Sequence, residues 1–223
     1  MMQKHFTFNK RRLDLDLTYR CPLECGSCSR QAFPDEIKKG HDMTVEDFKK
    51  CLKFASNILF SGTYSDPIHH PQFIEFLKMS YNSRVPIRIE TASSFKSEKW
   101  FIKAFKANPN AKWQFGIDGL PEDSHKYRKN QDGKKLFGIM LLSKKYLKNP
   151  ATWQYIAFNY NEEHIEWCKS FAKDFGLNFK LIISGKYKDM NDTRDFTAPT
   201  MEKYILPRND DQSIIKDIRL TYE

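Results

Sequence analysis

The sequence predicts an α/β fold: a parallel sheet closed partway into a (βα)6 barrel, followed by a short irregular C-terminal tail. Short apolar runs recur six times along residues 13–183, at the even spacing typical of strands. Between them lie longer segments in which apolar residues recur at helical spacing. Strands that alternate with helices in this way favour parallel pairing through right-handed crossovers.

The predicted elements follow in chain order. The first strand alternates Leu13, Leu15 and Leu17 with aspartates and ends at Thr18. The other strands are predicted at 57–60, 86–90, 113–117, 153–158 and 179–183. The helices between them begin at residues suited to a helix start or are delimited by periodicity. The predicted starts are Thr44, which opens a capping box, and Pro71, Ser97 and Asn161; periodicity alone marks a helix from about Lys134 to Leu147.

Three of the five cysteines lie in the loop directly after the first strand. Cys21, Cys25 and Cys28 are accompanied by Pro22 and Gly26, which keep the loop from forming a helix. Thiolates are the soft ligands that iron–sulfur clusters and zinc prefer. A structural zinc site normally takes four protein ligands. Three cysteines would leave one iron of a 4Fe–4S cubane open to a substrate.

A zinc site is the alternative interpretation, with His41, Cys51 or His5 as the fourth ligand. The cysteine spacing alone leaves this open, whereas the spacing together with the preceding strand favours a cluster. Cys51 and Cys168 fall on apolar helix stripes, where a free cysteine behaves as a small buried hydrophobe. We therefore predict that neither binds an auxiliary cluster.

The pattern Cys-x3-Cys-x2-Cys after the first strand of a βα chain resembles the radical S-adenosylmethionine (SAM) superfamily. The resemblance implies that Cys21, Cys25 and Cys28 hold a 4Fe–4S cluster whose open iron binds the amino and carboxylate groups of SAM. It also implies reductive cleavage of SAM to a 5′-deoxyadenosyl radical that abstracts hydrogen from a substrate. An electron donor such as flavodoxin or ferredoxin would supply the electron.

The loop 62–67 after the second strand resembles the Gly-Gly-Glu-Pro loop that meets the amino group of SAM in this superfamily. The resemblance implies SAM contacts from Gly62, Thr63 and Asp66, with Asp66 in place of the glutamate. An acceptor is what an ammonium group needs. An ordinary βα turn would also use these residue types.

Residues 115–128 resemble the Ser-x-Asp-Gly…His-x-x-x-Arg run of the peptide- and protein-modifying branch, which includes sulfatase-maturing and SPASM-type enzymes. The resemblance implies that Arg128 pairs with the SAM carboxylate and that Asp118 belongs to the cofactor site. Thr91 and Ser93 are expected ribose contacts. The resemblance is expected to stop before the auxiliary-cluster region of larger relatives.

Three residues depart from the pattern of this branch. Gly116 stands where a polar serine is common, Ala92 where an asparagine is common, and Ser27 where an aromatic residue is common. These departures predict a SAM site that is weaker or differently arranged.

The substrate is predicted less directly. A peptide or protein side chain follows from the resemblance, and Glu90, at the end of the third strand, is the acidic residue most expected to face it. A modified RNA is the second candidate, because the net charge is +9 and the segment 126–148 is strongly basic. That segment carries no aromatic–glycine RNA-binding signature, so a solvated outer helix is favoured. A non-catalytic metal- or SAM-binding module is the third candidate.

The chain of 223 residues is expected to form one core domain over 1–183 with a tail or cap over 184–223. The first twelve residues lack an apolar signal core, and no apolar run approaches membrane-spanning length. Cysteines bunched in one loop fit a reducing compartment. A cytoplasmic protein with no membrane partner is expected.

Overall fold

The computed structural model describes residues 10–26, 28–183 and 199–204. Six strands form one open sheet in the order β1-β2-β3-β4-β5-β6, and every neighbouring pair is parallel. The strands are β1 (Arg11–Leu15), β2 (Ala55–Phe60), β3 (Ile87–Thr91), β4 (Lys112–Gly116), β5 (Thr152–Ile156) and β6 (Asn178–Ile182). This arrangement confirms the predicted partial barrel.

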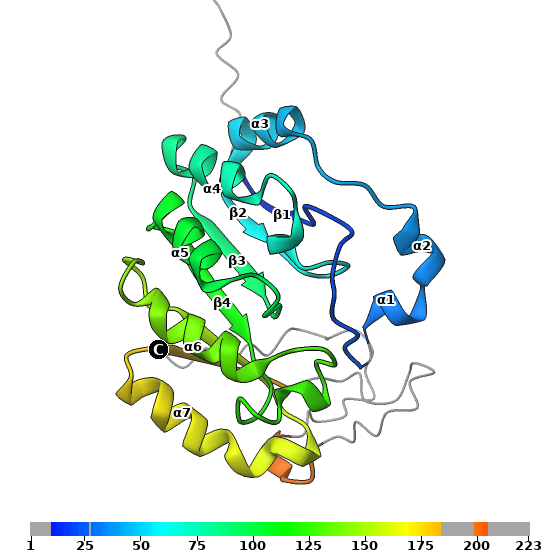
Figure 1. Cartoon of the computed structure of the whole chain (residues 1–223), viewed down its shortest axis with the longest axis vertical. Helices are drawn as coiled ribbons and strands as arrows, with labels where there is room; N and C mark the ends of the chain where they lie inside the picture. Colours follow the sequence, from blue (N-terminus) through cyan, green and yellow to red (C-terminus); the bar gives the residue numbers. More distant parts are fainter. Residues whose placement is uncertain (1–9, 27, 184–198, 205–223) are drawn as a thin grey trace, which may run out of the picture.

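Five helices connect successive strands and follow one another along one side of the sheet (Figure 1). They are α3 (Val45–Phe54), α4 (Phe73–Asn82), α5 (Glu98–Ala107), α6 (Gly133–Ser143) and α7 (Ile165–Asp174). Two shorter helices, α1 (Ser29–Ala32) and α2 (Pro34–Lys38), lie across from them, after the cysteine loop. No helix in the described part of the chain is long and apolar enough to cross a membrane.

The two faces of the sheet differ sharply in polarity. On β4 and β5, Trp113, Phe115, Trp153 and Tyr155 are fully buried toward the helices. Trp113 meets Phe105 of α5 edge to face, with ring centroids 5.0 Å apart. The alternate positions, which include Gln114 and Gln154, are mostly polar and form the inner face of the barrel, because successive side chains of a strand point to opposite faces. The core therefore lies between the sheet and the helices, and the inner face is available for a functional site.

Several boundaries differ from prediction. The first strand ends at Leu15 rather than Thr18, because Asp16 turns to the neighbouring loop and accepts a 2.8 Å hydrogen bond from the Ser65 hydroxyl. Asn161 does not cap α7. Its fully buried side chain accepts from the Phe158 N–H, and a 3-10 turn over Asn159–His164 precedes the helix. Helices α1 and α2 were not predicted, because they are too short to show the helical periodicity of apolar residues.

Only residues 199–204 of the predicted tail lie within the described chain. The carboxylate of Glu162 accepts from the backbone N–H groups of Thr200 and Met201, at 2.7 and 2.9 Å. Tyr204 is buried, and its hydroxyl donates to Glu166 at 3.0 Å. These contacts attach the segment to the end of the barrel beside α7. The boundary at residue 184 lies outside the described residues and stays a prediction.

The two cysteines outside the loop are expected to be dispensable for metal loading. Cys168 is fully buried on α7, and Cys51 is half-buried on α3. Cys168→Ala should lower the free energy of unfolding by on the order of 1 kcal/mol, since only a small sulfur is removed from the core, and Cys51→Ala by less. Urea unfolding checks the first effect. Iron analysis after reconstitution should find both variants equal to wild type, and a loss of iron in either would contradict this prediction.

Candidate functional site

The cysteine loop is held at the C-terminal end of the sheet by segments distant in sequence. The Asp66 N–H donates to the Arg20 carbonyl at 3.0 Å, which joins the loop after β2 to the cysteine loop. The Glu24 and Gly26 N–H groups donate to the carbonyls of Lys129 and Tyr127, at 3.2 and 3.1 Å. The conformation of the loop is therefore set from both sides by the barrel.

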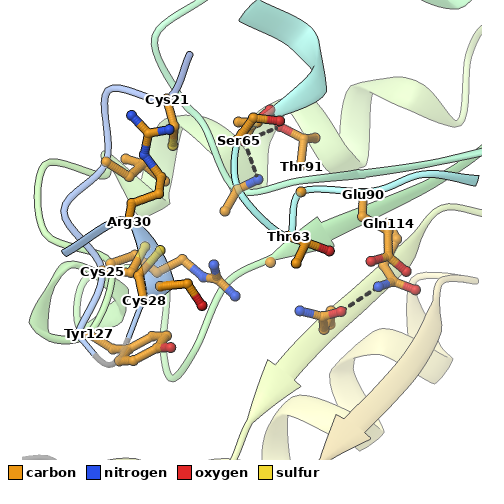
Figure 2. Close-up of a pocket in the computed structure, with 18 residues that line it drawn as sticks. Cys21, Cys25, Cys28, Arg30, Thr63, Ser65, Glu90, Thr91, Gln114 and Tyr127 are labelled. Carbon is orange, nitrogen blue, oxygen red and sulfur yellow. Dashed lines mark hydrogen bonds between the residues drawn. The ribbon is translucent and has the colours of Figure 1, made fainter. Parts of the chain in front are cut away.

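Cys21, Cys25 and Cys28 all line one cavity of about 340 Å³. Figure 2 shows them on one side of this cavity, with Glu90 and Gln114 on the opposite side. Burial raises the pKa of Cys21 to about 12, and the nearby Asp66 adds to this effect. Burial also raises the pKa of Cys25 to about 11, although the Arg128 guanidinium opposes the rise. The pKa values of Cys21 and Cys25 both lie above neutral pH, so metal binding at these two thiols should release protons.

Asp66 is a buried junction between the loops after β2 and β3. Its carboxylate accepts from the Thr91 hydroxyl at 2.8 and 2.9 Å and from the Ala92 and Ser93 N–H groups, both at 2.9 Å. It also accepts from the Ile68 N–H at 3.3 Å. Asp66 lines the cavity, but these donors already occupy both of its oxygens. It thus fixes the shape of two loops, and its contact with the SAM amino group stays a prediction.

The other predicted contacts in these two loops divide into lining and supporting residues. Gly62, Thr63 and Thr91 line the cavity. A Cβ on Gly62 would lie 2.8 Å from the Ser65 carbonyl oxygen, so the tight turn requires glycine. Ser93 is fully buried and does not line the cavity. Its hydroxyl lies 2.7 Å from Nε2 of His69, which makes it a supporting residue of the loop.

Asp118 and Arg128 form a buried ion pair next to the cysteines. The Arg128 Nε lies 2.6 Å from Oδ2 of Asp118, whose side chain is completely buried, whereas the Arg128 side chain is 12% exposed and lines the cavity. The Asp118 Oδ1 accepts from the Ile156 N–H at 2.7 Å. Burial raises the pKa of Asp118, and the guanidinium beside it opposes that rise. Asp118 therefore lies behind Arg128 and holds it, while Arg128 faces the cavity.

The departure at Gly116 follows from this pair. The Arg128 guanidinium packs so closely over Gly116 that a Cβ there would lie 2.7 Å from Nη2. A serine at this position would occupy the same space. Glycine thus makes room for the arginine.

Gly116→Ala should consequently push the guanidinium away from Asp118. We expect the free energy of unfolding to fall by about 1–3 kcal/mol, as for other overpacked sites, measured by urea unfolding. Gly138→Ala is the matched control, because a Cβ on that helical glycine meets nothing within 4 Å. The control should be neutral or stabilising by up to about 1 kcal/mol. Equal effects in the two variants would contradict the close approach.

Several lining residues were not predicted from the sequence. Arg30 of α1 donates to the Tyr64 carbonyl at 2.6 Å and to the Tyr19 carbonyl, so it links the cysteine loop to the loop after β2. Gln114 and Gln154 line the cavity from β4 and β5. Their position opposite the buried aromatic residues, in strict alternation, is the signal that could have identified them. Glu90, the predicted substrate-facing acid, does line the cavity.

Comparison with known proteins shows the class of fold. No protein-family model matches the chain, and no curated protein matches it. Streptococcus suis SuiB bound to precursor peptide SuiA matches with a TM-score of 0.62 at 12% identity, over 78% of this chain and 39% of that one. Methylornithine synthase (PylB) matches with 0.59 at 12% identity, over 85% and 61%. The protein anSMEcpe with bound AdoMet matches with 0.58 at 18% identity, over 85% and 54%.

These structures are radical SAM enzymes, and the six-stranded sheet with its helices has the fold of their partial barrel. At identities this low, the likeness shows the fold alone. The chain spans between 39% and 61% of the lengths of the solved structures it matches.

Proposed function

We propose that the protein is a radical SAM enzyme that holds one 4Fe–4S cluster on Cys21, Cys25 and Cys28 and binds SAM in the adjoining cavity. The observation that carries the proposal is the three-cysteine loop itself. It faces a polar cavity at the C-terminal end of a sheet with the radical SAM fold. Active sites of (βα)-barrel enzymes lie at this end of the strands.

The donor set fits a cluster better than a single ion. Among the described residues, no group of three or more His, Cys, Asp and Glu side chains is placed to hold one metal ion. A zinc ion needs its ligands to converge on one point. The thiolates of a cubane each bind a different iron and surround the cluster instead. The three thiols placed around one cavity support the second arrangement.

When bound, the cluster and SAM together supply one-electron cleavage of SAM and hydrogen abstraction. The residues of this chain bind and orient. Arg128 offers a planar guanidinium, which suits the SAM carboxylate, and Asp118 holds it in place. Gly62, Thr63 and Thr91 form the opposite rim of the SAM site, and Asp66 fixes the two loops that carry them. The reducing electron comes from a donor protein of the flavodoxin or ferredoxin type.

A peptide or protein is the favoured substrate. SuiB, which shares the fold, has been solved with a precursor peptide. Modification of RNA is the second candidate, supported by the net charge of +9 and the basic segment 126–148. Its lysines Lys134, Lys135, Lys144 and Lys148 are exposed on and after α6, an outer helix, and do not line the cavity.

Reductive cleavage of SAM tests the proposal. Protein reconstituted anaerobically with iron and sulfide should form methionine and 5′-deoxyadenosine from SAM when a reductant is added. SAM should also perturb the EPR signal of the reduced cluster. If the cluster assembles but SAM is neither bound nor cleaved, the protein is a metal-binding module. If SAM is bound but not cleaved, the protein is a non-catalytic SAM-binding module. Either result would overturn the enzyme proposal.

A further inference from the structure

Four polar side chains form a continuous wall on the inner face of the barrel, across strands β3 to β6. Glu90 is the register partner of Gln114, and Gln154 is the register partner of Lys180. Glu90, Gln114 and Gln154 line the cavity, and Figure 2 shows Glu90 and Gln114 on the side away from the cysteines. Nothing in the proposed SAM site uses these residues. They are placed where a substrate would meet the cofactor.

The contacts within this wall fix the orientation of its two amides. The Lys180 ammonium can only donate, and its Nζ lies 3.2 Å from Oε1 of Gln114. The Nε2 group of Gln114 therefore points the other way and donates to Oε1 of Gln154. The Nε2 group of Gln154 is therefore a donor, and no residue in the described part of the chain accepts a hydrogen bond from it. Lys180 thus determines which end of each glutamine amide accepts and which end donates.

At the other end of the wall, Glu90 presents a carboxylate that can only accept. Its Oε1 lies 3.8 Å from the Lys180 Nζ, and its side chain is 29% exposed. At that separation the two charges compensate each other without a short hydrogen bond. The wall is therefore close to neutral, with an acceptor at Glu90 and a donor at Gln154.

We propose that this wall recognises an amide group of the substrate, with its N–H given to Glu90 and its carbonyl accepting from Gln154. A trans peptide amide carries one donor and one acceptor that point in opposite directions, which complements an acceptor and a donor at opposite ends of the wall. A carboxylate or an ammonium matches only one of them. Lys180 is a positioning residue, because it acts through Gln114. The proposal rests on the proposed function and specifies the group that is brought to the SAM site.

The wall favours a peptide amide over the amide-like edge of a nucleobase. Unstacked bases are recognised largely by stacking on aromatic rings or guanidinium planes. The aromatic residues of these strands, Trp113, Phe115, Trp153 and Tyr155, are buried on the other face of the sheet. Among the described lining residues, the groups that could stack on a base are Tyr127, Arg30 and Arg128. Figure 2 shows Tyr127 and Arg30 on the side of the cysteines, and none of the three belongs to the wall.

Saturation-transfer NMR on the reconstituted protein with SAM tests this inference, with N-acetyl-alanine N′-methylamide as the peptide probe and uridine as the nucleoside probe. We expect the peptide probe to bind and uridine not to. Glu90→Gln and Lys180→Met should each weaken peptide binding by about tenfold or more, the loss expected for one hydrogen bond to a charged group. Lys180→Arg should retain most of the binding, because arginine also donates only. Glu75→Gln, an exposed acid on α4, is the matched control.

Peptide binding that is unchanged in both Glu90→Gln and Lys180→Met would overturn the inference, and so would binding of uridine in place of the peptide. Iron content, SAM-induced EPR changes and thermal unfolding are measured on the same samples. Loss of the cluster or of SAM binding in wild type would instead contradict the proposed function. Variants that fold and load normally yet bind the probe as wild type does would contradict only the role of the wall. A Lys180→Arg protein as weak as Lys180→Met would contradict the positioning role.

Discussion

Replacement of Cys21, Cys25 and Cys28 by alanine, singly or together, is expected to abolish the iron–sulfur cluster. Wild-type protein should bind about four irons per chain after anaerobic reconstitution, as one cubane requires. Each single variant removes one of three ligands and should lose the visible thiolate-to-iron absorbance together with all formation of 5′-deoxyadenosine. Iron and sulfide analysis and the absorbance spectrum measure the effect.

The control for this prediction lies in the same chain. Cys51 and Cys168 belong to α3 and α7 and do not line the cavity, so their alanine variants should keep full iron content. Stoichiometric zinc in the wild-type protein, without iron–sulfur absorbance, would show that the loop is a zinc site.

Removal of the Arg128 guanidinium should have the largest effect on stability of any single change at the site. Arg128→Ala leaves Asp118 completely buried without its partner, and breaking a buried pair in this way costs about 3–5 kcal/mol. SAM affinity should also fall about tenfold to a hundredfold, because a charge-assisted contact with the carboxylate is worth about 1.5–3 kcal/mol. Urea unfolding and SAM titration followed by EPR measure the two effects.

A double variant separates these two roles. Arg128→Met combined with Asp118→Asn removes both charges, so it should recover much of the stability but still bind SAM weakly. Lys129→Ala is the matched control, since its ion pair with Glu24 at 2.7 Å is largely exposed and should be worth less than about 1 kcal/mol. A double variant that binds and cleaves SAM as wild type does would show that Arg128 has only a structural role.

The sequence predicted the sheet well because its strands are marked locally. Trp113 and Phe115 alternate with polar residues, and Thr44 begins α3 by accepting from the Asp47 N–H at 3.1 Å. Such signals involve neighbours in sequence, so no tertiary contact is needed to detect them. The cysteine loop was predicted for the same reason, since its three thiols lie within one short stretch.

The roles of the charged residues could not be predicted in this way. Asp66 and Asp118 were both predicted to belong to the cofactor site, and that prediction stays open. Their partners could not be read from the motifs: Asp66 accepts hydrogen bonds from the loop after β3, and Asp118 pairs with Arg128, ten residues further along the chain. The pairing of Lys180 with Gln114 joins β6 to β4 and likewise has no local signature. Motif resemblance locates such residues near the site, and the three-dimensional contacts decide which of them face it.

The hydrogen bonds that hold the cysteine loop also constrain when the loop can form. Asn130 donates to the Pro22 carbonyl at 3.3 Å across 108 positions of the chain, and the Glu24 and Gly26 bonds to residues 127–129 span a similar separation. Contacts this distant pay the entropy of closing a long loop before they contribute stability, and they form late in folding. Residues 22–26 leave the ribosome early, but their native conformation waits for the segment after β4. Cluster insertion should therefore follow synthesis of the fourth strand and its loop, and a nascent chain that stops before residue 127 should present its thiols without the framework that orients them.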